Sequence, residues 1–252
     1  MVNSSSPLFS IITITKNPGD SFHRTAHSIL SQQHADFEWI VVDGSTEQRS
    51  RKIVLSYTHY ISRIVNDVGN GISSAWNQGI SLARGSYILL LNSGDTYVDD
   101  FLQCCARYVD GNNIVCGHPM ICDIHGRPIR LYKTSLSKTH LGMYIAHEWM
   151  CIPRQIYANL GPYLEISHAM DFEYIKRILS HYGRSIFVPI PLQTCGCFYL
   201  GGLSDKYFLQ SQIAAFGINL IYAIPLHQAA SHLILAISKH LVKTCLIKCR
   251  LQ

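Results

Sequence analysis

Short apolar runs alternate with amphipathic segments through the first half of the chain. A bounded run of about four to eight apolar residues is typical of a buried strand, and apolar residues at helical spacing are typical of a helix. The runs expected to form strands are 9–15, 39–43, 61–65, 87–91 and 114–116. The helices expected between them are 21–30, 51–57, 73–83 and 98–107. This alternation predicts an α/β fold with a mainly parallel sheet covered by helices.

The second half of the chain follows the pattern less regularly. Residues 120–132 predict a hairpin with His125 and Gly126 at its middle. Residues 156–160 and 172–182 predict helices, and 185–190 predict a strand.

The C-terminal tail differs from the rest. Residues 213–247 are apolar at helical spacing, but Pro225 and several polar residues interrupt them. No uninterrupted stretch there reaches the roughly 20 residues that a membrane-spanning helix needs. The tail also carries Lys239, Lys243, Lys248 and Arg250 with no acid nearby. It is either a basic amphipathic helix that lies on an anionic membrane surface or a helix packed on the domain with a solvated basic face.

Composition favours a folded protein of one domain, or one domain with an appendage. The chain has 252 residues, of which 48% are hydrophobic and 15% are charged. The net charge of +5 suits an anionic small ligand or a membrane surface and is too small to indicate nucleic acid. The nine cysteines contain no CxxC pair, and residues 1–17 lack the basic start of a signal peptide. We therefore expect a cytoplasmic protein with reduced thiols.

Polar residues follow the expected parallel strands at the point where each one ends. In an open parallel sheet, ligands bind beyond the carboxyl ends of the strands. The residues at those ends are Thr15, Lys16, Asn17, Asp43, Asp67 and 92–95. Carboxylates that converge on one edge repel each other unless a cation or a hydrogen-bonding base compensates them. Any one Asp is better explained as the start of a turn, but the set together favours a ligand site.

The motifs around these residues resemble a known family. The motifs occur in order at 10–17 (SIITITKN), 28–33 (SILSQQ), 37–46 (FEWIVVDGST), 71–79 (GISSAWNQG) and 83–95 (ARGSYILLLNSGD). Together they resemble the inverting GT-A glycosyltransferases of family 2, and most of all the branch in colanic-acid, O-antigen and capsule gene clusters. The resemblance covers about residues 8–205. It implies a GT-A domain at 1–205, with a donor half at 8–117 and an acceptor half at 118–205, followed by a basic helical extension at 206–252.

The resemblance implies a nucleotide-sugar donor, most simply a UDP-sugar. Thr15 and Asn17 would line the nucleotide pocket. Asp43 would accept a hydrogen bond from the uracil ring or another base, and Asp67 would lie near the base and ribose.

The motif at 92–95 would hold the diphosphate. Asp95 matches the last acid of the family's DxD-type motif and would bind Mg²⁺ or Mn²⁺, with Ser93 and Gly94 beside it at the donor. The chain departs from the family here, because Asn92-Ser93-Gly94-Asp95 carries one acid where relatives often carry Asp-x-Asp-Asp. In the preceding loop, Gly69 stands where an Asp is common.

The acceptor half contains the expected base. Inversion requires a group that takes the proton from the incoming hydroxyl. The segments 147–154, 160–163 and 169–177 also follow the family pattern, and Asp171 falls at the position of its catalytic base. We expect the start of a helix there, which favours an ionised carboxylate and limits its basicity. Local sequence alone would make Asp171 an ordinary helix-start acid. The resemblance also places His147 and Glu173 in the acceptor or phosphate region, and a loop at 201–204 over the donor.

The leading hypothesis is a metal-dependent inverting transferase of bacterial surface polysaccharide or lipopolysaccharide synthesis, acting on a glycan or a lipid-linked acceptor. It would work in the cytoplasm, with the basic tail at the inner face of the cell membrane. The motif at 92–95 has a single acid, which motivates an alternative hypothesis. In it the chain is a catalytically silent relative that binds a nucleotide or docks partners at the membrane. A Rossmann dehydrogenase is disfavoured because no GxGxxG follows the first strand.

Overall fold

The computed structural model describes residues 6–32, 35–139 and 142–249. Within these residues the main sheet has seven strands in the order β10-β6-β9-β4-β1-β2-β3. Their bounds are β1 (Phe9–Thr15), β2 (Phe37–Asp43), β3 (Arg63–Asn66), β4 (Tyr87–Leu90), β6 (Ile114–Cys116), β9 (Met150–Pro153) and β10 (Phe187–Pro189). All neighbouring pairs are parallel except those of β9, which runs antiparallel to β4 and β6. The predicted mainly parallel sheet is confirmed.

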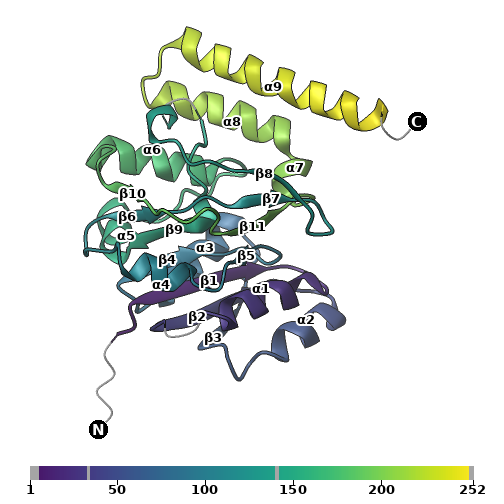
Figure 1. Ribbon diagram of the computed structural model, residues 1–252, viewed down its shortest axis with the longest axis vertical. Helices are drawn as coiled ribbons and strands as arrows, with labels where there is room; N and C mark the ends of the chain where they lie inside the picture. The colour runs from purple at the N-terminus through teal and green to yellow at the C-terminus, as the bar shows by residue number, and fades with distance from the viewer. Residues whose placement is uncertain (1–5, 33–34, 140–141, 250–252) are drawn as a thin grey trace.

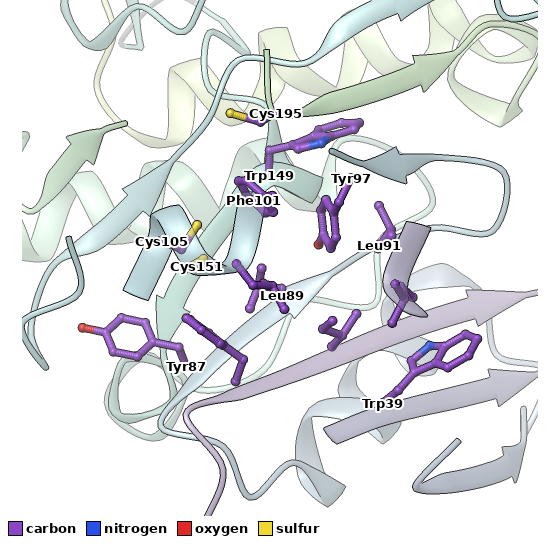
Figure 2. Close-up of a cluster of buried hydrophobic side chains, with 14 of the residues drawn as sticks. Trp39, Tyr87, Leu89, Leu91, Tyr97, Phe101, Cys105, Trp149, Cys151 and Cys195 are labelled. Carbon is purple, nitrogen blue, oxygen red and sulfur yellow. The ribbon is translucent and has the colours of Figure 1, made fainter. Parts of the chain in front are cut away.

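Helices cover both faces of this sheet because alternate strand residues point to opposite sides. The helices between the strands are α1 (Ser21–Leu30), α2 (Gln48–Leu55), α3 (Ile72–Leu82), α4 (Phe101–Ala106), α5 (Arg154–Leu160) and α6 (Met170–Tyr182). Ile11 and Leu89 lie in a core with residues of α1, α2 and α4, part of which Figure 2 shows. Ile12 and Ile88 lie in a second core with residues of α3, α5 and α6.

The element boundaries differ from the prediction by a few residues. Helix α2 begins at Gln48, three residues before the expected start at 51. The Asn17 side-chain oxygen accepts hydrogen bonds from the backbone N–H groups of Thr46 and Glu47, at 2.8 and 3.0 Å. This contact satisfies donors just ahead of the helix and allows it to begin earlier.

A second, four-stranded sheet lies beside the main one in the order β5-β11-β7-β8. Its strands are β5 (Thr96–Tyr97), β7 (Met120–Cys122), β8 (Pro128–Leu131) and β11 (Gly196–Tyr199). Strands β7 and β8 pair antiparallel, which confirms the predicted hairpin. Strands β5, β9 and β11 were not predicted from the sequence. A Cβ at Gly196 would lie 1.8 Å from the Thr96 carbonyl oxygen, so only glycine fits where β11 crosses β5.

The C-terminal extension forms a helical layer on the acceptor half. It comprises α8 (Phe208–Ile221) and α9 (Leu226–Cys249), and the short helix α7 (Leu203–Lys206) leads into it. Figure 1 shows α8 near α6 and α9 on the outer side of α8. The Tyr222 hydroxyl, just after α8, donates to Glu173 of α6 at 2.8 Å, and the ring of His240 in α9 stacks on Phe208 at 4.1 Å. In the part of the chain that the structure describes, no helix has the length and apolar character needed to cross a membrane.

We expect Gly196→Ala to destabilise the protein, because its Cβ would overlap the Thr96 carbonyl and would lie 2.5 Å from the Trp149 ring nitrogen. The expected loss is about 2 kcal/mol or more in the free energy of unfolding, measured by urea denaturation. Gly202→Ala is the matched control, since nothing lies within 4 Å of its added Cβ. Equal midpoints for the two variants would contradict the close packing of β11 on β5.

Candidate active site

The carboxyl ends of β1, β2 and β3 bring the predicted nucleotide-pocket residues to one edge of the sheet. The register pairs Thr15 with Asp43, and Asp43 with Asn66. The backbone N–H of Asp67 donates to the carbonyl oxygen of Asp43 at 3.0 Å. A Cβ added at Gly44 would lie 2.9 Å from the Asp67 carboxylate, so that carboxylate lies directly against the β2 end. The gathering of these residues follows from parallel pairing.

The side chains at this edge differ in whether they already have hydrogen-bond partners within the protein. The buried Asp43 carboxylate accepts the backbone N–H of Ser45 at 2.9 Å, and Asp67 accepts that of Gly69 at 3.0 Å. The Thr15 hydroxyl is buried and has no hydrogen-bond partner among the described residues. Buried polar groups without partners are uncommon in folded proteins, so this hydroxyl favours a ligand contact at the strand ends.

Asn17 shapes the edge from within the protein. Its backbone has a φ of 50°, and its side chain donates to the Thr46 hydroxyl at 3.0 Å. Together with the contacts at the start of α2, this bond commits the Asn17 amide to joining the loops after β1 and β2. Asn17 therefore lies at the predicted pocket with its amide already engaged.

The turn at 92–95 continues the same edge beyond β4. Helix α1 holds it, because the Thr25 hydroxyl donates to the Asp95 carbonyl at 2.8 Å and accepts the Gly94 N–H at 2.7 Å. The Ser93 hydroxyl is buried without a partner among the described residues. Asp95 is only 6% exposed, and its carboxylate accepts the backbone N–H of Tyr199 from β11 at 2.9 Å.

Burial disfavours the ionised form of the Asp95 carboxylate. It raises the pKa of Asp95 to about 7, although the Tyr199 N–H and the positive charge of Arg24 act in the opposite direction. Arg24 donates to the Gly94 carbonyl at 2.9 Å and lies over the Tyr199 ring at 3.6 Å. The motif therefore has one cation nearby, fixed by its own contacts.

Glu148 is a site residue that sequence analysis missed. It lies in a 3₁₀ turn, η2 (His147–Trp149), just before β9. Its carboxylate accepts a hydrogen bond from the Asn92 amide at 2.9 Å. Burial raises the pKa of Glu148 to about 8, and the negative charges of Asp95 and Asp171 add to the effect. Its only sequence signal was an acid inside a matched segment, which no local pattern singles out.

Asp171 lies close enough to Glu148 for its negative charge to act on that carboxylate. It is the second residue of α6, after Ala169 in the left-handed conformation at φ 58°. Burial raises the pKa of Asp171, while the Phe172 N–H, at 2.8 Å, opposes the rise. The expectation that the helix start would limit its basicity is therefore wrong, because desolvation outweighs the helix start.

The two residues assigned to the acceptor or phosphate region have different surroundings. The His147 ring bonds the Tyr163 hydroxyl at 2.6 Å and lies 4.8 Å from the Trp76 ring. Burial lowers the pKa of His147 to about 3, so the ring is neutral and brings no positive charge to a phosphate. Glu173 is buried in an ion pair with Arg177, and together with the Tyr222 bond this directs it toward α8.

A family model described as glycosyl transferase family 2 matches residues 10–176. The chain belongs to glycosyl transferase family 2. The predicted family resemblance is thereby confirmed.

Two similar proteins carry the names of biosynthetic glycosyltransferases. The chain is 29% identical over 150 residues to TuaG of Bacillus subtilis, named as a teichuronic acid biosynthesis glycosyltransferase. That match covers 54% of this chain and 60% of TuaG. A PGL/p-HBAD biosynthesis glycosyltransferase of Mycobacterium tuberculosis is 26% identical over 183 residues, covering 69% of this chain and 71% of the relative. The chain thus spans about 60% of the first of these relatives.

Solved structures confirm the GT-A fold. TarS of S. aureus in complex with UDP-GlcNAc superposes with a TM-score of 0.65 at 16% identity, covering 92% of this chain and 72% of that one. The mannosyltransferase PcManGT of Pyrobaculum calidifontis, in complex with GDP-Man and Mn²⁺, gives a TM-score of 0.62 at 15% identity, covering 95% and 76%.

The oxygen donors of this family 2 site fit a divalent cation. Among the described residues, no three His, Cys, Asp or Glu side chains lie close enough to form a metal site by themselves. Asp95 and Glu148 supply hard carboxylate oxygens, and neither is paired with Lys or Arg in the described part of the chain. Mg²⁺ and Mn²⁺ can bind with only one or two protein ligands, because diphosphate oxygens and waters complete their coordination shells.

The raised acid pKa values predict how stability changes with pH. Asp95 titrates near 3.8 when unfolded and at about 7 when folded, so the folded state holds the proton longer. Its stabilising contribution is complete at low pH and is lost as the pH rises through about 7. We expect the metal-free protein to lose stability between pH 5 and 8, and Asp95→Asn to lose less, as measured by urea unfolding in chelator.

Asp110→Asn is the control, because backbone N–H groups lower the pKa of that exposed acid. It should leave the change between pH 5 and 8 as in the wild type. An equally steep decline in Asp95→Asn and wild type would contradict a desolvated Asp95.

Proposed function

We propose that the chain transfers a sugar, with inversion, from a nucleoside-diphosphate sugar to an acceptor hydroxyl. The observation that carries this proposal is that Glu148 meets the turn at 92–95, where the Asn92 amide donates to it at 2.9 Å, and that the charges of Asp95 and Asp171 both act on it. Acids at a strand edge suit a cation-bound diphosphate on one side and a proton-accepting group on the other. The UDP-GlcNAc complex of TarS supports a UDP-sugar as the donor.

The donor would lie along the strand ends. Asp43 would accept a hydrogen bond from the base, and Asp67 would lie near the base and ribose. Thr15 would use its unpartnered hydroxyl, and Asn17 would hold the loop geometry.

The turn at 92–95 would face the diphosphate. Ser93 and Gly94 would lie beside it, and Asp95 would hold Mg²⁺ or Mn²⁺. The cation, when bound, neutralises charge on the departing nucleoside diphosphate. The Mn²⁺ complex of PcManGT supports this choice of metal.

Asp171 would act as the general base. Its burial raises its pKa, which makes the ionised carboxylate a stronger acceptor for the proton of the incoming hydroxyl. Attack from the face opposite the leaving diphosphate inverts the anomeric carbon. His147 would contribute a neutral surface near the acceptor, and Glu173 would keep α6 in place through Arg177 and Tyr222.

The acceptor would be a cell-surface glycan or a lipid-linked precursor of one. The relatives named for teichuronic acid biosynthesis and for PGL/p-HBAD biosynthesis support this class. The chain would divide into a catalytic domain at 1–205 and an extension at 206–252. The extension would contact the membrane.

Exposed apolar side chains support a membrane-contacting extension. Ile221 is 80% exposed at the end of α8, and Leu226 is 64% exposed at the start of α9. Residues 206–252 contain no Asp or Glu, whereas Lys206 and Lys239 are exposed. Exposed apolar residues and exposed cations in one helical layer suit an anionic lipid surface. This contact would hold a cytoplasmic enzyme at the inner face of the cell membrane, near a lipid-linked acceptor.

We expect Asp171→Asn to lower turnover by at least about a hundredfold while donor affinity stays within about threefold of wild type. Nucleotide release measures turnover, and isothermal titration with the donor measures affinity. Donor binding without turnover in the wild type on any glycan or lipid-linked acceptor would instead favour a catalytically silent relative. Equal turnover in Asp171→Asn and wild type would remove Asp171 as the base.

We expect the wild type to sediment with vesicles containing about 30% anionic lipid and to be released by high salt. The double variant Ile221→Ser/Leu226→Ser should sediment several-fold less. Leu55→Ser, at a 51% exposed leucine on α2, should sediment like the wild type. Equal sedimentation of both variants would contradict contact through the α8–α9 turn.

A further inference from the structure

The turn at 92–95 offers one carboxylate, and the fold brings a second acid to it from far along the chain. Glu148 follows Asn92 by 56 residues, yet the Asn92 amide donates to its Oε1 atom at 2.9 Å. In the described part of the chain, no other residue donates a hydrogen bond to the second Glu148 oxygen, Oε2. The bond to Asn92 therefore fixes the carboxylate and leaves one oxygen for another ligand.

Two contacts tie Glu148 to residues on either side of Asp95. Asn92 precedes Asp95 in the same turn, where the Asp95 N–H donates to the Asn92 carbonyl at 3.2 Å. Tyr97 follows Asp95, and its hydroxyl donates to the Glu148 backbone carbonyl at 3.1 Å. The η2 turn is thus held against the acidic motif by side chain and backbone together.

The Asn92 amide is itself oriented. The Trp76 indole N–H donates to its oxygen at 3.3 Å, which turns the amide NH₂ toward Glu148. An aspartate at position 92 would have no N–H to donate and would repel Glu148. Asn at 92 and Glu at 148 are therefore complementary.

In the described part of the chain, neither carboxylate forms an ion pair with a Lys or Arg side chain. Among the described residues, the ion pairs join Arg49 to Asp20, Arg84 to Glu38 and Arg177 to Glu173. Arg24 acts on Asp95, but its own bonds hold it at the Gly94 carbonyl and the Tyr199 ring. Two carboxylates so placed repel each other until a further cation compensates them.

We propose that Glu148 is the second protein carboxylate for the divalent cation at Asp95, positioned by Asn92. This inference rests on the proposed nucleoside-diphosphate transferase function and names a further residue for its metal. Glu148 would contribute Oε2, while Oε1 stays with Asn92. Relatives often carry an aspartate at the first position of the motif, where this chain has Asn92. In this arrangement Glu148 of the η2 turn supplies the carboxylate that Asn92 lacks.

The test measures Mn²⁺ binding, not activity. Free Mn²⁺ is followed by electron paramagnetic resonance during titration of the full chain, saturated with UDP or GDP, whichever raises the melting temperature more. We expect Glu148→Gln to weaken Mn²⁺ binding by about tenfold or more, with nucleotide affinity in chelator unchanged. Asp95→Asn should weaken Mn²⁺ binding at least as much. Glu165→Gln, at an exposed acid elsewhere, should bind Mn²⁺ like the wild type.

A reciprocal variant separates a metal ligand from a merely structural residue. In Asn92→Asp/Glu148→Gln the carboxylate and the amide exchange places, so Mn²⁺ affinity should return to within about threefold of wild type. Wild-type Mn²⁺ affinity in Glu148→Gln would overturn the inference while leaving the proposed function intact. A folded Glu148→Gln with weakened Mn²⁺ binding that the reciprocal variant fails to restore would also overturn it. A wild type that binds neither UDP nor GDP, with or without Mn²⁺, would overturn the proposed function itself.

Discussion

The parallel register of β1 with β2 and β4 decides where the donor-side polar residues of the site lie. This register ends three strands at one edge, so the residues that follow them share that edge. The sheet is buried on both faces, and a one-residue slip would turn buried side chains toward the wrong core. Because Ile11 and Ile12 belong to different cores, such a slip would disrupt the packing of both cores at once. The position of the acids is therefore fixed by apolar packing that takes no part in chemistry.

The acceptor half is joined to this edge by a small number of polar bonds. The Asn77 side chain of α3 donates to the Tyr163 carbonyl and accepts its N–H, both at 2.9 Å. The Tyr163 hydroxyl in turn bonds the His147 ring, and Glu148 is the next residue. These bonds hold the η2 turn against the donor half, which explains how a segment far along the chain reaches the acidic motif.

The elements that could be predicted are those whose signals are local. Strands 9–15 and 87–91 were predicted because they are short, mainly apolar runs, and Asp43 and Asp95 were singled out because they come at the ends of such runs. Strands β5 and β11 were missed, since they are short and depend on pairing across about a hundred residues, as in the bond of Cys197 to Thr96. Glu148 was missed for a similar reason. Its place in the site depends on Asn92 and Asp95, which are distant in the sequence, and not on the residues next to it in the chain. The raised pKa of Asp171 depends on burial, which the helix start does not reveal.

A crystal structure with UDP and Mn²⁺ would show whether these acids share one cation, because manganese can be located by its anomalous scattering. We expect manganese within about 2.0–2.4 Å of carboxylate oxygens of Asp95 and Glu148, with the base beside Asp43 and with Asp171 facing the opposite side of the sugar position. Manganese bound away from Asp95, or a nucleotide away from the ends of β1 and β2, would contradict this expectation.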